Sequence, residues 1–435
     1  MALASNEEGM QDIKDNWRII LAAGLCLFFM FGVPTFMFPW IYREVIAEFD
    51  WSRAQATDVI SVKFLVGALC AILIGWAVDK FGPRKITILA CLIGGSAMLS
   101  FTLLTPAGVA GISAHNFYMM LGGFLGLSSL GIMISTKTLL GRMFEGNMGT
   151  ALGLALVGTS LAGAATPFLF GFLKDAYGWR EAIAILSMGI WFVALPFYIF
   201  SVREEIGGSV EKATSLKTTT KPDDAVSIND FLKGRNFWLI VIGLPLIAMV
   251  DMGVAQHYVL YMSNDLGLDI TMVRTGATIM AIIAAAAKVG FGRLYDKTST
   301  KGIAFTYILL GFAVLLLFPV EGFVSMMVCL AIKGTAHGGL VVDVPVATKH
   351  CYGAWGIGKK IAIFTMVYGF GLSGGPRFMG MIYDTYGSYT YGFITLICLS
   401  IIAAILMYFV KPDYWLKTKA GNELRSNEAT QALKA

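Results

Sequence analysis

The 435-residue chain is 57% hydrophobic and only 14% charged, with a formal net charge of +5. A soluble domain carries about 25% charged residues, so this composition excludes a soluble globular protein and indicates an integral membrane protein. A chain of this length has room for roughly a dozen spans of ~20 residues. Its positive charge is concentrated in particular loops, and no nucleic-acid partner is needed to explain it.

Apolar runs separated by polar breaks predict an all-α membrane protein with twelve transmembrane helices. The predicted spans are 18–41, 54–79, 86–105, 115–141, 150–173, 181–201, 237–262, 273–294, 302–320, 323–348, 358–382 and 389–410. The polar stretch 202–236 has the composition of a flexible linker and divides the spans into two sets of six. We therefore expect an N-terminal segment over 1–17, six-helix bundles over 18–201 and 237–410, and a tail over 411–435.

The loops on the side of the two chain ends contain far more lysines and arginines than the loops on the other side. Basic loops stay in the cytoplasm during membrane insertion. We therefore expect a multi-pass protein of the plasma or inner membrane, with both termini and the linker cytoplasmic. The functional unit is expected to be a monomer in the lipid bilayer.

Two motifs recur in the two halves of the chain. The stretches "GWAVDKFG" (75–82) and "GRLYDKTS" (292–299) share Gly-x3-Asp-Lys, and "PFLFGFLKDAYG" (167–178) and "PRFMGMIYDTYG" (376–387) share Pro-x3-Gly-x3-Asp-x-Tyr-Gly. Two features at nearly the same offset indicate a duplicated six-helix unit. Such pseudo-repeats form the halves of alternating-access transporters, with the substrate site between them.

The twelve spans, the central linker and "GWAVDKFGPRK" after the second span resemble the major facilitator superfamily. A narrower resemblance, to the monocarboxylate transporters and the oxalate:formate antiporters, rests on "GTALGLALVGTSLAGAATPFLFGFLKDAYGWREAIAIL" (149–186). The expected conformational latch consists of charged residues at the inner ends of the helices, where Asp79 can pair with basic groups across the interface. Its predicted members are Asp79, Arg84, Arg142 and Asp296.

Seven ionisable residues fall well inside predicted spans. They are Lys63, Lys137, Lys288, Lys333, Arg377, Asp251 and Asp343. A charge near the bilayer midplane costs at least ~2.5 kcal/mol on insertion scales, so each must face a cavity or a partner. Five positive and two negative groups leave an excess of cations, which suits a pathway for an anion.

The resemblance implies a role for Lys288. In the monocarboxylate and oxalate transporters, an arginine four residues before a glycine of the eighth span binds the substrate carboxylate, and Gly292 and Asp296 place Lys288 at that position. A lysine replaces the two-pronged guanidinium by a point charge. An ion pair with Asp251 and a position at the lipid surface are the alternatives for Lys288.

Other members of the resembled pattern are missing. Ala284 stands where animal-type monocarboxylate transporters have an aspartate, and Phe36 and Tyr368 align with a span-1 and a span-11 lysine of these families. Phe36 either lines an aromatic pocket or serves in packing. We include Phe36 and Tyr368, with Arg377 and Lys333, in the predicted substrate site around Lys288.

For proton coupling, Asp251 is the preferred group, followed by His337 and Asp343. Lys333 and His337 are four residues apart and share a helix face, and Asp343 either pairs with Lys349 or lies on a proton path. The predicted function is a secondary transporter that moves an organic monocarboxylate by proton symport, with carboxylate exchange or export of a neutral or aromatic solute or drug as alternatives. HExxH and Walker motifs are absent from the sequence, so we expect neither an enzyme nor a metal or other cofactor.

Overall fold

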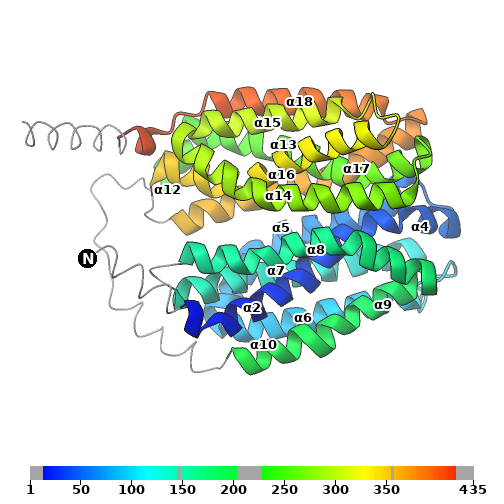
Figure 1. Cartoon of the computed structure of the whole chain (residues 1–435). Helices are drawn as coiled ribbons and strands as arrows, with labels where there is room; N and C mark the ends of the chain where they lie inside the picture. Colours follow the sequence, from blue (N-terminus) through cyan, green and yellow to red (C-terminus); the bar gives the residue numbers. More distant parts are fainter. Residues whose placement is uncertain (1–12, 145–147, 203–227, 354–356, 418–435) are drawn as a thin grey trace, which may run out of the picture.

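The computed structural model describes residues 13–144, 148–202, 228–353 and 357–417. These residues are almost entirely helical and form two bundles that lie side by side (Figure 1). Within the described ranges the only extended pairing is an isolated bridge between Val109 and Ile112. The predicted segment 1–17, the linker 202–236 and the tail 411–435 lie mostly outside the described residues.

The first bundle contains six spans, of which the first is built from four short helical segments. Its elements are α2 (Trp17–Cys26), the π-helix η1 (Leu27–Gly32), α3 (Val33–Met37), η2 (Phe38–Trp40), α4 (Tyr42–Phe49), α5 (Arg53–Phe81), α6 (Pro83–Ser100), η3 (Phe101–Leu103), α7 (Ala114–Met143), α8 (Met148–Tyr177), α9 (Trp179–Gly189), η4 (Ile190–Ala194) and α10 (Leu195–Ser201).

The second bundle also contains six spans. Its elements are α12 (Ile228–Lys233), α13 (Arg235–Leu260), η5 (Tyr261–Asp265), α14 (Ile270–Thr298), α15 (Thr300–Leu315), α16 (Phe323–Tyr352), α17 (Ile357–Tyr386) and α18 (Thr390–Tyr408). The short helix α12 lies within the predicted linker, so the last part of that segment is helical rather than flexible coil.

The prediction of twelve spans is confirmed, and each predicted span overlaps one described span. Ten described segments are long and apolar enough to cross a membrane. The other two are α15, with 16 residues, and α17, whose 30 residues include Lys359, Lys360 and Arg377. Large apolar side chains such as Phe192 and Phe200 are exposed on the bundle surface, as expected for a surface that contacts lipid.

Local sequence explains where the spans begin and end. Ser52 and Gln55 form a reciprocal capping box at the start of α5, which satisfies backbone donors that have no partner within the helix. Gly82, with a φ of +86°, ends α5, and Pro83 begins α6. Pro34 has no N–H to donate to the carbonyl of Met30, and the Ser129 hydroxyl of α7 donates to that carbonyl at 2.7 Å instead.

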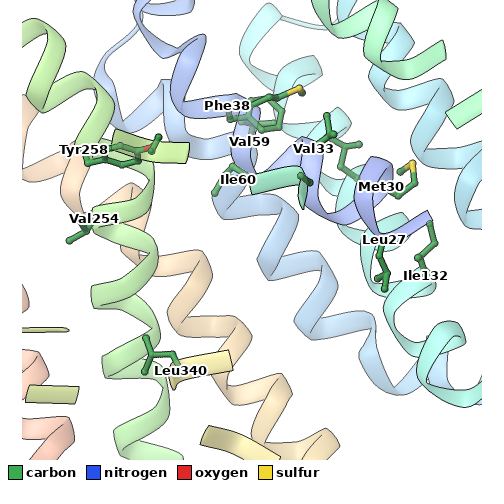
Figure 2. Close-up of a cluster of buried hydrophobic side chains, with 14 of the residues drawn as sticks. Leu27, Met30, Val33, Phe38, Val59, Ile60, Ile132, Val254, Tyr258 and Leu340 are labelled. Carbon is green, nitrogen blue, oxygen red and sulfur yellow. The ribbon is translucent and has the colours of Figure 1, made fainter. Parts of the chain in front are cut away.

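Each bundle has an apolar core, and small residues allow its helices to approach closely. Figure 2 shows part of this buried cluster, in which Met30, Val33 and Phe38 of the first span lie near Val59 and Ile60 of α5. At Gly122 and Gly126 of α7, an added Cβ would lie 2.4 and 2.2 Å from carbonyl oxygens of α5. Between the bundles, α5 packs along α17 and α8 packs along α14.

Candidate substrate and proton pathway

The two bundles are joined by polar contacts at one end of the molecule. We call this the far end, because it lies opposite the end at which α2 begins and α18 finishes, here called the terminal end (Figure 1). Arg53 at the start of α5 pairs with Asp265 of η5 at 2.6 Å, and Arg274 of α14 pairs with Asp175 of α8 at 2.8 Å.

The repeated Pro-x3-Gly-x3-Asp-x-Tyr-Gly motif supplies an aspartate to the far-end contacts in each half. Its aspartates are Asp175 in the first half and Asp384 in the second. Asp384 accepts hydrogen bonds from the backbone N–H groups of Arg53 and Ala54 at 2.9 and 3.0 Å, and Asp175 pairs with Arg274. Each aspartate therefore contacts the start of the second span of the other half, which is the relation expected of a duplicated unit.

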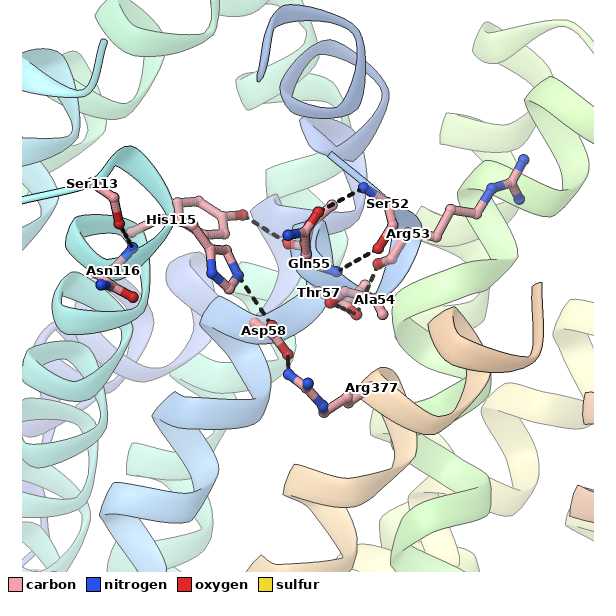
Figure 3. A network of polar contacts seen from close by, with 12 residues as sticks. Ser52, Arg53, Ala54, Gln55, Thr57, Asp58, Ser113, His115, Asn116 and Arg377 are labelled. Atoms are coloured by element: carbon pink, nitrogen blue, oxygen red, sulfur yellow. Dashed lines mark hydrogen bonds and ion pairs between the residues drawn. The ribbon is translucent and has the colours of Figure 1, made fainter. Parts of the chain in front are cut away.

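A further contact between the bundles lies about one turn along α5 from Arg53, away from the far end. It involves an acid that sequence reasoning missed. Asp58 of α5, 2% exposed, pairs with Arg377 of α17 and with His115 of α7, whose Nε2 lies 3.1 Å away (Figure 3). Asp58 falls inside the predicted second span, so its position in the sequence could have revealed it. The intramembrane charge balance therefore includes three acids, and Arg377, predicted in the substrate site, has a carboxylate partner.

Asp251 of α13 lies in a buried cluster with two of the other predicted residues. Its carboxylate oxygens lie 2.9 Å from Lys333 Nζ and 2.9 Å from His337 Nδ1, both on α16. The shared helix face predicted for Lys333 and His337 explains why one carboxylate contacts both. The alternative in which Asp251 pairs with Lys288 is wrong for this structure, because Asp251 pairs with Lys333 and His337 and Lys288 donates to Ser160 instead. The His337 side chain is 29% exposed, whereas Lys333 and Asp251 are buried.

Lys288 lies at the interface between the bundles. Its Nζ donates to the Ser160 hydroxyl of α8 at 2.7 Å, and it has no carboxylate partner among the described residues. The side chain is half-buried, which argues against the lipid-facing alternative. On the same helix, Ala284 packs against Gly338 of α16, whereas no atom lies within 4 Å of a Cβ added at Gly292.

The remaining predicted substrate-site residues do not form one cluster with Lys288. Phe36 is partly buried, and its ring lies against Gly163 of α8, close enough to contact a Cβ added there at 3.2 Å. Tyr368 of α17 is also partly buried and lies near the carboxylates of Asp251 and Asp343. Of the four residues predicted around Lys288, Lys333 and Tyr368 both lie near Asp251, whereas Arg377 and Phe36 make separate contacts.

Asp343 of α16 is fully buried and accepts a hydrogen bond from the Tyr307 hydroxyl at 2.9 Å. The predicted alternative of an ion pair with Lys349 is wrong, since Lys349 is exposed two turns further along α16. Sequence reasoning missed Tyr307, which stands in the mostly apolar sequence of α15.

The predicted latch residues lie at the terminal end and contact groups within their own halves. Asp79 pairs with Arg142 at 3.5 Å, and the Asp79 side chain is 76% exposed. The Arg84 guanidinium donates to the carbonyl of Val202, and the carbonyl of Asp296 accepts a hydrogen bond from the Trp415 indole. A latch that joins the two halves at the terminal end stays a prediction, and it concerns a conformation in which the terminal end is closed.

Comparisons with known proteins agree with this architecture. The chain is 25% identical over 385 residues to Monocarboxylate transporter 13 of Bos taurus, covering 87% of this chain and 85% of that protein. It is 22% identical over 404 residues to a cis,cis-muconate transport protein of Acinetobacter baylyi, covering 87% and 93%.

Among solved structures, a bacterial homologue of the human lysosomal transporter Spinster superposes with a TM-score of 0.71 at 17% identity. The superposition covers 92% of this chain and 97% of the homologue. The family model described as Major Facilitator Superfamily matches residues 20–342 and 246–435. The chain therefore belongs to the major facilitator superfamily, as the resemblance in the sequence indicated.

Proposed function

We propose that the chain is a secondary active transporter that moves an organic monocarboxylate together with protons by alternating access. The observation that carries this proposal is Lys288. Its ammonium group lies between the two bundles, is half-buried, and is hydrogen-bonded by a neutral hydroxyl rather than a carboxylate. Such a cation can exchange its hydroxyl acceptor for the carboxylate of a substrate, because an ammonium group is attracted more strongly to an opposite charge than to a neutral hydroxyl.

The orientation in this proposal places both termini in the cytoplasm, following the distribution of basic loops. The far end, where the bundles are joined, then faces outward. Alternating access requires that these contacts break while contacts at the terminal end form. The relatives named as monocarboxylate and muconate transporters support a carboxylate substrate.

Proton coupling is assigned to the Asp251 cluster. His337 is the part-exposed member of this cluster, so it is the member that a proton from the pathway can reach first. A proton gained by His337 strengthens its attraction to Asp251 and weakens the relative hold of Asp251 on Lys333. Asp251 thus links the protonation of His337 to the position of a neighbouring cation on α16.

The test uses purified protein in proteoliposomes with labelled acetate, lactate, pyruvate and benzoate, with and without a proton gradient. Lys288→Ala abolishes uptake, Lys288→Arg retains part of it, and the surface variant Lys301→Ala matches the wild type. Asp251→Asn keeps exchange but loses accumulation driven by the gradient. Exchange without accumulation by the wild type would favour an exchanger, and carboxylate-independent transport of neutral or aromatic solutes would favour an exporter.

A further inference from the structure

Lys63 of α5 is a fully buried ammonium group without a carboxylate partner in the described part of the chain. It is the eleventh residue of α5, so it lies about 15 Å along the helix from Arg53. Lys63 is 2% exposed, and its Nζ donates to the Thr35 hydroxyl at 2.5 Å. The rings of Phe31 and Phe64 lie 5.3 and 5.2 Å from the same nitrogen.

This environment leaves most of the binding capacity of Lys63 unused. An ammonium group has three donors, and a buried charge that lacks a counter-ion is costly. An apolar side chain of similar length would fill the same volume without that cost. The other deep cations of the far half of the molecule contrast with Lys63, since Arg377 pairs with Asp58 and Lys333 with Asp251.

Lys63 lies beside the interface between the bundles. The carbonyl of Thr35 accepts a hydrogen bond from Gln256 of α13, in the other half, at 3.3 Å. The next residue, Phe36, contacts Gly163 of α8, which lies one turn from Ser160, the acceptor of Lys288. The segment Thr35–Phe36 thus stands between two ammonium groups that come from different halves.

The contacts that join the bundles control access to Lys63. The pairs Arg53–Asp265 and Asp58–Arg377 both involve α5 at positions nearer the far end than Lys63. Separation of the halves at the far end breaks these pairs and the Gln256–Thr35 contact, and so opens a route to Lys63. Lys288 needs no such opening, because it is already half-exposed.

From these contacts we propose that Lys63 is a second carboxylate-binding residue, which holds the substrate when the far end is open. The proposal rests on the proposed carboxylate transport and adds a site in the N-terminal half. The substrate carboxylate replaces the Thr35 hydroxyl as acceptor for Lys63. As the far end closes, the carboxylate passes to Lys288, and Thr35 again accepts the hydrogen bond from Lys63.

The experiment measures KM for acetate, lactate, pyruvate and benzoate from each side of proteoliposomes that contain protein in one orientation. Lys63→Met keeps the length of the side chain and removes the charge. It raises KM at least tenfold for transport that starts at the far end and less than threefold for transport that starts at the terminal end. Lys288→Ala abolishes transport from both sides, which separates the two roles.

A second variant keeps the proposal testable if Lys63→Met does not fold. Thr35→Val retains the lysine and removes its internal acceptor, so KM at the far end falls because the substrate no longer competes with the hydroxyl. An equal fold-change in KM on both sides, relative to the wild type, in either folded variant would overturn the proposal and make Lys63 a packing residue. Absence of transport of all four carboxylates by the wild-type protein would instead overturn the proposed function.

Discussion

The pair between Asp58 and Arg377 is expected to hold the far end closed, and Asp58→Asn tests this directly. The substitution keeps the size of the side chain and an acceptor for His115, but removes the charge that attracts Arg377. The Asp58 side chain is 2% exposed and the Arg377 side chain 53% exposed, so the pair is intermediate between a surface pair and a buried one.

The magnitude follows from these exposures. A surface pair contributes about 0–1 kcal/mol, and breaking a buried pair costs about 3–5 kcal/mol. Arg377 can reach water once its partner is neutral, which places the loss at ~2 kcal/mol. Because every 1.4 kcal/mol is a factor of ten, the ratio of far-end-open to far-end-closed molecules rises roughly 30-fold.

The assay uses Ser61→Cys as a reporter in a background without the six native cysteines. Ser61 lies one turn below Asp58 on α5, is 5% exposed, and its hydroxyl is without a described partner. A membrane-impermeant maleimide applied at the far end labels this cysteine in proportion to the open population. The rate in Asp58→Asn rises by about the same factor as the population ratio while the open form is the minor one.

The matched control is Asp50→Asn, the same change of charge at the same end of the molecule. Asp50 is exposed, caps α4 with a φ of +55°, and asparagine tolerates that conformation. A labelling rate within threefold of the wild type in Asp58→Asn would refute the reasoning. An equal increase in both variants would mean that net charge, rather than the pair across the halves, controls the opening.

Two further predictions concern folding stability. Gly158→Ala lowers the free energy of unfolding by about 1–3 kcal/mol, because the added Cβ would lie 2.2 Å from the Gly24 carbonyl oxygen. The control is Gly153→Ala on the same helix, whose added Cβ meets no atom within 4 Å. Thermal unfolding in detergent compares the two variants. At Glu48, hydrogen bonds from Arg180 lower the pKa of the carboxyl group from its ordinary value of 4.5. The contribution of the Glu48 carboxylate to stability is therefore complete above pH 4.5 and is lost as the pH falls through the lowered pKa. Glu48→Gln removes this contribution, so the melting temperature of the variant falls less steeply at acid pH than that of the wild type. Identical profiles for the two proteins would mean that the Glu48–Arg180 pair contributes nothing to stability.

The positions of the spans could be predicted from the sequence because the bilayer requires apolar segments of a certain length. Caps such as Ser52 and breaks such as Gly82–Pro83 set their ends locally. The duplicated motifs likewise predicted two equivalent halves, and the contacts of Asp175 and Asp384 agree with that equivalence.

The partners of the charged residues could not be predicted in the same way. Depth in the membrane can be counted along a helix, and by depth alone Asp251 matches both Lys288 and Lys333. Which helices are neighbours around the bundle is not encoded in an apolar run, and Asp251 pairs with Lys333 of α16. The pairing of Asp343 with Tyr307 depends on the same lateral arrangement.

The π-helical segment η1 gives the first span a mechanical property that a uniform α-helix would lack. A π turn holds one residue more than an α turn, and one residue corresponds to about 100° of rotation about the helix axis. Conversion of Leu27–Gly32 to α-helical hydrogen bonding would therefore rotate everything beyond it, including Thr35 and Phe36, by roughly that angle. The Thr35 hydroxyl would leave Lys63 and the Phe36 ring would leave Gly163 without any tilt of the bundles. Rotation of the first span about its own axis, rather than a hinge motion, would then change which of its side chains face the pathway.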